Sequence, residues 1–382
     1  MNADGSGVQK LTSLDRDPAT PLWAHDGSGV YVSVASQGTS NVFFVPANGA
    51  GAAAVTTGSQ MMALSSLSRT GTGAGVRSDF AHAPNVVRVE TGRRGAAATT
   101  QLTQVNDDLI ARLRLASEER LVVRSTNGTD VEGWIVKPPS FDPSKKYPMI
   151  MEIHGGPHGM YNVAFNPMYQ NFAANGFVVL YVNPRGSTGY GSAFGNAIYH
   201  NYPGPDYDDL MAAVDGAVAK GYIDPARLYV GGCSGGGVLS SWVIGHTDRF
   251  AAAAVRCPVI DWMSFAGHTD VPLFTYGFFE KPFWEDPKPW LEHSSLMYVG
   301  HVKTPTLLMT GVLDMRTPMP QTEEYYAALK MRGVPAALLQ FEGEYHGTGS
   351  KPSNWMRTQL YMMSWYNQWP KQARVAGNTI TP

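Results

Sequence analysis

After about residue 119, the sequence alternates short unbroken apolar runs with segments of helical periodicity. The apolar run YPMIMEI (147–153) precedes NPMYQNFAANG (166–176), and FVVLYVN (177–183) precedes DYDDLMAAVDGAVAKG (206–221). Unbroken apolar strands that take turns with helices are typical of a mostly parallel sheet with helices on both faces. The pattern therefore predicts an α/β domain with a doubly wound sheet over residues 116–382.

Further segments complete this predicted domain. Two alternating runs within residues 119–137 surround Asn127-Gly128, a dipeptide that strongly favours a β-hairpin turn. Apolar runs at 250–259, 305–311 and 336–343 predict three more strands. The amphipathic segment after residue 353, NWMRTQLYMMSWYNQWP, predicts a closing helix whose Met and Trp side chains belong to the core.

The first part of the chain follows a different pattern. Asp-Gly-Ser-Gly occurs at residues 4–7 and again at 26–29, each time before a strand-like run. The segment PLWAHDGSGVYVSV (21–34) is similar to the blade repeats of TolB-like β-propellers. Only two or three such units fit before about residue 115, whereas closed propellers have about four to eight blades. We therefore expect a partial β-propeller-like domain over residues 1–115, as a remnant or a truncated form, with an unrelated small antiparallel β domain as the alternative.

Charge and hydropathy limit the partners. The chain has 382 residues with 29 basic and 31 acidic side chains, a net charge of −2, so no general field recruits nucleic acid or anionic lipid. It contains no run of about 18 apolar residues of the kind that spans a membrane. We expect no nucleic-acid or membrane partner and leave a homo-oligomer open. No signal segment opens the chain, but the apparent truncation leaves the compartment undetermined.

The only two cysteines are Cys233 and Cys257. Both follow apolar runs that could form neighbouring strands, so a disulfide is one alternative. Buried free thiols, however, behave as small hydrophobic groups and are common. We therefore favour free thiols.

The segment RLYVGGCSGGG (227–237) places a serine among glycines between a predicted strand and a predicted helix. It matches the G-x-S-x-G nucleophile elbow, in which the serine lies on a tight strand-to-helix turn and projects its hydroxyl above the sheet. Neighbouring side chains would clash there, which explains the glycines. We predict Ser234 as a nucleophile and the Gly235 N–H as an oxyanion donor. The alternative is an ordinary Gly-rich turn between strand and helix with no catalytic role.

A serine hydroxyl needs a base to accept its proton. In α/β-hydrolases the chain order is Ser, acid, His. His346 follows the strand-like AALLQFEG, at the C-terminal end of a predicted strand, and is the predicted base. His246 falls in the helix after the elbow, and His293 and His301 follow no clear strand end.

The acid that orients this histidine should also follow a strand. Asp314 lies between the predicted strand PTLLMTG and the segment PQTEEYYAALKMRG, and Asp261 is the reserve candidate. The acidic segment DYDDL at 206–210 could suggest a metal cluster, but it precedes a helix whose positive end favours acids, so we interpret it as capping. We expect no metal and no cofactor.

Two more segments are candidates for contact with substrate. The aromatic insertion VPLFTYGFFEKPFWED could form an acyl or side-chain pocket through Phe278, Phe279 and Trp284, or could be a cap packed on itself. Arg185 could bind a substrate carboxylate, although a structural contact within its loop is the favoured reading. The loop HGGP that begins at His154 should supply a second oxyanion donor.

Several motifs in order resemble those of the prolyl oligopeptidase (S9) family, nearest its acylaminoacyl-peptidase-like branch. They are HGGPHG, NPRGSTGYGSAF, GYIDPARLYVGGCSGGG, TPTLLMTGVLDMRTPMPQ and GEYHG, within about residues 119–372. The resemblance implies an α/β-hydrolase fold with Ser234 as nucleophile, His346 as base and Asp314 as its orienter. It also implies backbone oxyanion donors at Gly235 and Gly156, and an N-terminal propeller that screens the site.

Two departures from the family pattern affect the expected substrate. The residue after the serine, commonly aromatic in the family, is Gly235, so we expect a wider pocket floor. The propeller is incomplete, so its size filter should be weak. We therefore predict a serine hydrolase that cleaves small esters or short acylated peptides, with peptidase and carboxylesterase both open. The alternative is a non-catalytic binding protein on an inactive hydrolase fold.

Overall fold

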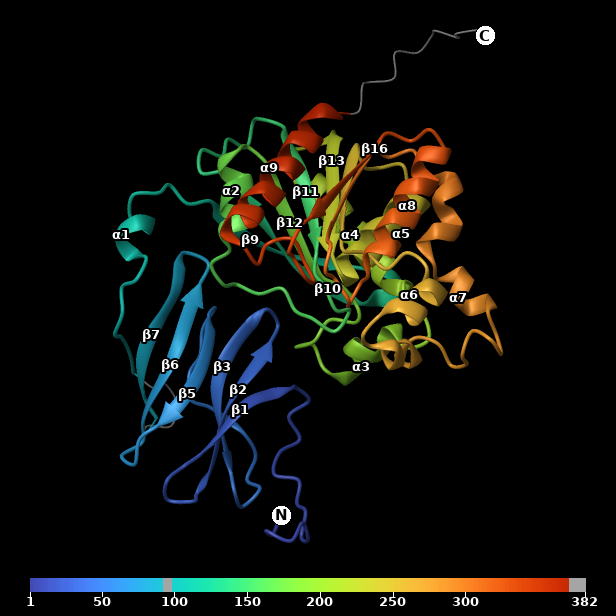
Figure 1. Cartoon of the computed structure of the whole chain (residues 1–382). Coiled ribbons are helices and arrows are strands. Elements are labelled where there is room, and N and C mark those ends of the chain that lie inside the picture. The colour runs from blue at the N-terminus through green and yellow to red at the C-terminus, as the bar shows by residue number, and fades with distance from the viewer. Residues whose placement is uncertain (92–97, 371–382) are drawn as a thin grey trace, which may run out of the picture. The chain divides into compact units, whose positions relative to one another are not determined.

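The structure is a computed structural model that describes residues 1–91 and 98–370 of the chain (Figure 1). Two compact units emerge from its contacts. The first unit comprises Met1–Leu115, Met160–Pro167 and Ser187–Asn196, and the second comprises the remaining segments from Ala116 onwards. The simple division at residues 115 and 116 therefore stays a prediction, because two later segments cluster with the first unit.

The first unit is built on an eight-stranded sheet. Its strands follow the order β1-β2-β3-β5-β6-β7-β8, with β4 paired to β3. All its pairs are antiparallel except for a single parallel contact between β3 and β5, at Ser40 and Met61, so the sheet consists of two successive meanders. The strands are β1 (Pro18–Trp23), β2 (Gly29–Ser36), β3 (Thr39–Pro46), β4 (Ala53–Ala54), β5 (Met61–Leu67), β6 (Thr72–Asp79), β7 (His82–Glu90) and β8 (Thr99–Gln101).

Local sequence explains these strands. Along β7 alternate side chains are buried, and Val87 and Val89 join a small apolar core with Met62 and Leu64. The β2–β3 hairpin turns through Gln37 and Gly38, both at positive φ, as a two-residue turn requires. This all-β unit agrees with the predicted propeller-like segment.

The second unit contains the predicted mostly parallel sheet. Its strand order is β16-β15-β14-β13-β11-β12-β10-β9, and every pair from β12 through β11 to β16 is parallel. The predicted hairpin forms the antiparallel edge, with Asn127 at a φ of 57° in its turn. The strands are β9 (Ser117–Arg124), β10 (Asp130–Lys137), β11 (Tyr147–Ile153), β12 (Val178–Asn183), β13 (Ile223–Cys233), β14 (Ala252–Arg256), β15 (Thr306–Gly311) and β16 (Ala336–Phe341).

Helices cover both faces of this sheet (Figure 1). On β13, Leu228 and Val230 belong to the large apolar core that α4 and α5 also enter, whereas Tyr229 between them stacks on Tyr366 of α9, with 4.7 Å between ring centroids. The α-helices are α1 (Asp107–Ile110), α2 (Pro167–Ala174), α3 (Ser192–Gly195), α4 (Pro205–Ala219), α5 (Gly235–His246), α6 (Trp262–His268), α7 (Lys288–Glu292), α8 (Met319–Met331) and α9 (Pro352–Gln368). The sheet and its two helical layers confirm the predicted α/β architecture.

Within residues 1–91 and 98–370, no helix combines the length with the apolar character that crossing a bilayer requires. The longest, α9, has 17 residues and keeps a polar face.

Candidate active site

Ser234 occupies the sharp turn between β13 and α5. Its backbone has a φ of 62° and a ψ of −121°, a conformation that non-glycine residues rarely adopt. The turn is anchored because the Ser234 N–H donates to the carbonyl oxygens of Arg256 and Cys257, at 3.2 and 3.1 Å. A Cβ atom on Gly232 would lie 2.6 Å from the carbonyl oxygens of Gly236 and Ile153, so this position admits only glycine. These are the steric features expected of a nucleophile elbow.

A disulfide joins Cys233, directly before this serine, to Cys257. This corrects the expectation of free thiols. The strands β13 and β14 are parallel neighbours, and Cys233 lies opposite Arg256, one residue before Cys257. The two Cα atoms are 5.2 Å apart, within the range that a disulfide spans. Strand adjacency, which the sequence only suggested, therefore makes the bridge possible.

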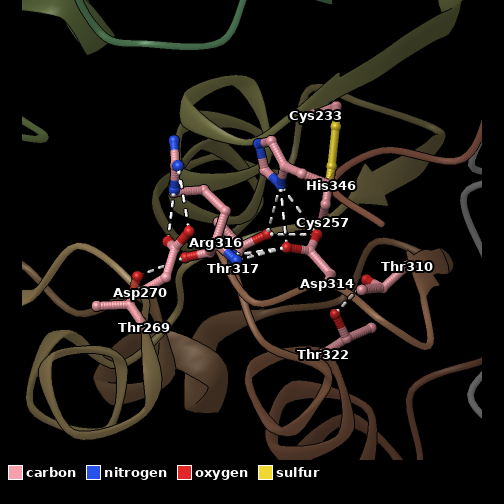
Figure 2. Close-up of polar contacts among 10 residues, drawn as sticks. All are labelled: Cys233, Cys257, Thr269, Asp270, Thr310, Asp314, Arg316, Thr317, Thr322 and His346. Carbon is pink, nitrogen blue, oxygen red and sulfur yellow. Dashed lines mark hydrogen bonds and ion pairs between the residues drawn. A yellow bond between two sulfur atoms is a disulfide. The ribbon is translucent and has the colours of Figure 1, made fainter. Parts of the chain in front are cut away.

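Asp314 and His346 come together from the loops after β15 and β16. The Nδ1 atom of His346 lies 2.9 Å from one Asp314 carboxylate oxygen and 3.2 Å from the other (Figure 2). The Asp314 side chain is fully buried, and the Thr317 hydroxyl donates to its Oδ2 at 3.0 Å. The backbone N–H groups of Arg316 and Thr317 donate to Oδ1, both at 2.9 Å. Three hydrogen bonds besides the contact with the imidazole thus fix this carboxylate.

Ser234 and His346 line one cavity of about 750 Å³ in the second unit. Its walls are mainly apolar and include Val238, Trp262 and Phe265. The rim carries an ion pair, because the Arg316 guanidinium donates to both carboxylate oxygens of Asp270, at 2.7 and 3.2 Å (Figure 2). This hydrogen-bonded pairing with Arg316 lowers the pKa of Asp270. An apolar pocket with a few polar groups is the usual form of a small-molecule site.

The HGGP loop packs against the elbow. Gly156 and Gly235 both line the cavity, and a Cβ atom on Gly235 would lie 2.8 Å from the Gly156 nitrogen. The space that a side chain after Ser234 would need is therefore filled by the backbone of Gly156. This corrects the expectation that Gly235 widens the pocket floor. Both glycine backbones therefore lie in the wall of the cavity that Ser234 also lines.

The other acid and histidine candidates lie elsewhere. Asp261 caps α6, because its Oδ1 accepts from the N–H groups of Met263 and Ser264. The Nδ1 atoms of His246 and His293 contact backbone carbonyl oxygens at 2.8 and 2.9 Å, and burial lowers the pKa of both rings. None of these side chains is among those that line the cavity, and neither is His301.

The aromatic insertion contributes to the cavity through different residues from those predicted. Phe278 and Phe279 are buried and Trp284 is 69% exposed, and none of the three lines the cavity. Phe278 lies behind its wall, with its ring 5.0 Å from that of Phe274, which does line it. The substrate-binding assignment is therefore corrected: the insertion lines the cavity through its first residues, 271–274. The rings of Phe278 and Phe279 instead pack against Trp262, outside the insertion.

Arg185 makes the internal contact that the sequence favoured, and its candidate role in substrate binding is corrected. Its Nε and one terminal nitrogen donate to the buried carboxylate of Asp209, at 2.7 to 3.1 Å, and it contacts Thr126 and the Pro205 carbonyl. Asp206 accepts from the backbone N–H groups of Gly204 and Tyr207 at the start of α4. The acidic segment therefore anchors the first turn of α4 and the loop that contains Arg185.

Some residues at the site escaped sequence reasoning. The Thr317 hydroxyl lies three residues after Asp314, a spacing that suits a contact with the carboxylate and could have revealed it. Tyr202 lines the cavity and its hydroxyl lies 3.3 Å from the Gly235 carbonyl oxygen. No local pattern marks Tyr202, because only the folded chain brings it to the elbow.

The chain is similar in sequence to several curated peptidases. It is 38% identical over 272 residues to the uncharacterized peptidase YuxL of Bacillus subtilis, covering 70% of this chain and 41% of that protein. It is 34% identical over 233 residues to the acylamino-acid-releasing enzyme of Arabidopsis thaliana, covering 59% and 30%. Dipeptidyl-peptidase 5 of Porphyromonas gingivalis aligns with 97% of this chain at 28% identity. The chain spans 54% of that last protein, so it corresponds to about half or less of each of these relatives.

Solved structures share the fold. An acylaminoacyl peptidase of Pyrococcus horikoshii superposes with a TM-score of 0.85 at 22% identity, covering 96% of this chain and 58% of that one. A puromycin hydrolase superposes with a TM-score of 0.75 at 24% identity, covering 92% and 61%. The sequence profile of the prolyl oligopeptidase family matches residues 163–373, more than half of the chain. This chain therefore belongs to the prolyl oligopeptidase family, peptidase family S9.

Proposed function

We propose that this chain is a serine hydrolase that cleaves small esters and short acylated peptides through an acyl-enzyme on Ser234. One observation carries the proposal. Ser234 in its strained turn and His346, whose imidazole is bound to the buried Asp314, line a single cavity. Membership of a peptidase family supports it, and Ser234, Asp314 and His346 follow one another in the chain order of α/β-hydrolase triads.

In the proposed acylation step, the Ser234 hydroxyl attacks the substrate carbonyl and His346 accepts its proton. Asp314 orients the imidazole through the contact at Nδ1 and stabilises its positive charge. The buried carboxylate keeps this orientation because Thr317 and two backbone N–H groups also hold it. His346 then returns the proton to the leaving group, and water releases the acyl group by the reverse path.

The developing oxyanion needs hydrogen-bond donors beside Ser234. The backbone N–H groups of Gly235 and Gly156 are the proposed donors. Gly235 begins α5, so its N–H belongs to the positive end of that helix. The close packing of the two glycines supports this assignment, because it leaves both backbones next to the serine.

The cavity walls indicate which substrates fit. Apolar side chains such as Val259, Trp262 and Phe265 suit a hydrophobic acyl group or side chain. Acylaminoacyl peptidases are among the proteins that share this fold, and the structure of one is a complex with Z-Gly-Gly-Phe-chloromethyl ketone. A hydrophobic acyl or aminoacyl group is accordingly the proposed occupant of the cavity. The preference for esters or for peptides is to be measured separately.

Covalent labelling tests the proposal. A fluorophosphonate probe should label the wild-type chain at Ser234 and should not label Ser234→Ala. Turnover of an activated ester should fall by about 10⁴-fold or more in Ser234→Ala and His346→Ala, since triad residues act as a unit. Far-ultraviolet circular dichroism provides the control for folding. Wild-type turnover in a folded Ser234→Ala variant would refute the assignment and favour a non-catalytic binding protein.

A further inference from the structure

One group of three metal-ligating side chains stands out among the residues that the structure describes. A ligand atom from each of Cys257, Asp314 and His346 lies within 4.8 Å of the other two. Figure 2 shows the sulfur of Cys257 next to the imidazole and the carboxylate. The proposed hydrolysis uses Asp314 and His346 but gives the sulfur no task.

The ligand types suit a particular kind of ion. Thiolate sulfur, imidazole nitrogen and carboxylate oxygen together are ligands that Zn²⁺ accepts, usually with four ligands in a tetrahedron. Three protein ligands leave a fourth position for water. Their present separations, including 2.9 Å between His346 Nδ1 and Asp314 Oδ2, are close enough for small side-chain rotations to bring them around one ion.

The disulfide blocks this site in the oxidised chain. Cys257 is bonded to Cys233, so its sulfur is not a thiolate and cannot ligate a metal ion. Cys257 itself is completely buried, whereas Cys233 keeps partial exposure. The His346 side chain is 34% exposed and lines the cavity, so an ion can enter from that side.

We propose that Cys257, Asp314 and His346 form an inhibitory site for Zn²⁺ or a similar thiophilic divalent cation, which the Cys233–Cys257 disulfide closes and reduction opens. The ion would take the place of the hydrogen bond that orients His346, so the imidazole could no longer serve Ser234 as a base. The oxidised chain is then active in the presence of the metal, and the reduced chain is not.

Reduction and metal binding are two separate steps. A phosphine gives two electrons to the sulfur–sulfur bond and leaves as the phosphine oxide, with its oxygen taken from water, and the two protons of that water end on the two thiols. Zn²⁺ then displaces the proton of the Cys257 thiol to solvent and forms a zinc–sulfur bond. Asp314 and His346 donate lone pairs, and no further oxidant or reductant is consumed.

A matched pair of variants separates this site from loss of the bridge alone. Cys233→Ser and Cys257→Ser both lack the disulfide and both keep one thiol, but only Cys233→Ser keeps the thiol beside Asp314 and His346. With Co²⁺ as a spectroscopic probe, Cys233→Ser should bind one ion per chain and show thiolate-to-cobalt charge-transfer absorption. Cys257→Ser should show none.

Inhibition by Zn²⁺ provides the second readout. Zn²⁺ should inhibit ester turnover by Cys233→Ser at concentrations at least about 10- to 100-fold lower than those that inhibit Cys257→Ser. Loss of a residue that merely hydrogen-bonds to a metal ligand already lowers metal affinity by about that factor, and Cys257→Ser lacks a ligand itself. Untreated wild type should respond like Cys257→Ser. Wild type reduced by a phosphine, which is then removed without air, should respond like Cys233→Ser, and it carries the test if a variant does not fold.

Two results would overturn the inference. One is equal sensitivity of the two variants to Zn²⁺, which would show that the Cys257 thiolate is not a ligand. The other is the absence of thiolate-to-cobalt absorption in folded Cys233→Ser and in the reduced wild type. The cobalt spectrum does not depend on hydrolysis, so failure of this inference and failure of the proposed serine hydrolase function remain distinguishable.

Discussion

Replacing Gly235 with alanine tests the proposed oxyanion donors through one atom. The new Cβ would lie 2.8 Å from the nitrogen of Gly156 and 3.0 Å from its carbonyl carbon and oxygen. All three atoms belong to the backbone, so no flexible side chain can yield. The HGGP loop must therefore move away from Ser234 by several tenths of an ångström to restore ordinary contact distances of about 3.5 Å.

The size of the effect follows from this displacement. Overpacking of a tight site costs about 1 to 3 kcal/mol of stability, so the chain should still fold. If the shift carries the Gly156 N–H out of hydrogen-bond reach, the loss of one oxyanion donor should lower kcat by about 10²- to 10³-fold. We therefore expect Gly235→Ala to unfold at a moderately lower denaturant concentration and to lose most of its kcat.

The assay measures kcat on an activated ester together with the denaturant midpoint. Gly267→Ala is the matched control. A Cβ atom at Gly267 would have no neighbouring atom within 4 Å, and the φ of this residue is not positive, so its kcat should stay at the wild-type value. A folded Gly235→Ala variant with wild-type kcat would refute the reasoning. It would mean either that Gly156 is no donor or that the loop moves without loss of the hydrogen bond.

Three further outcomes are expected. Activated short-chain acyl esters should exceed acylated dipeptides or amino-acid anilides by at least about tenfold in kcat/KM, because amide cleavage also needs protonation of the leaving amine; comparable rates would contradict this. Burial raises the pKa of Asp206 from 3.8 to about 7, so the stability that its protonation gives is present below about pH 4 and lost as pH rises through about 7. The free energy of unfolding of Asp206→Asn should therefore rise relative to that of wild type as pH increases from about 4 to about 7. A difference between the two free energies that stays constant with pH would contradict the raised pKa of Asp206. Reduction of the disulfide, which spans 24 residues, should lower the free energy of unfolding by about 3 to 4 kcal/mol, and a change under about 1 kcal/mol would show that the bridge constrains the unfolded chain little.

The sequence predicted those parts of the site that local chemistry determines. Ser234, Asp314 and His346 each follow an apolar strand, and parallel strands bring their carboxyl ends to one edge of the sheet. Glycines at the elbow could be foreseen in the same way, because a tight turn excludes side chains there. The α/β architecture followed from the alternation of apolar runs and helices.

Residues whose roles depend on long-range packing were beyond the sequence. From the sequence, Arg185 could bind either a ligand or an acidic side chain within the protein. Only the folded structure shows that Asp209 on α4 is its partner. The aromatic insertion contains several rings of similar hydrophobicity, and nothing local indicates that Phe274 reaches the cavity while Phe279 stacks on Trp290. The consequence of Gly235 was likewise hidden, because it depends on how closely another loop approaches.

The path of the chain between the two compact units limits how the protein can be divided. Residues 160–167 and 187–196 cluster with the first unit, although the sequence on both sides of each segment belongs to the second. A fragment that begins at residue 116 would carry both segments without their partners in the first unit, such as Gly38 in the β2–β3 turn, whose carbonyl oxygen accepts from the Val163 N–H. Modular exchange of the first unit between relatives would therefore require three transplanted segments that are compatible with one another, so the two units should diversify as a pair rather than as interchangeable parts.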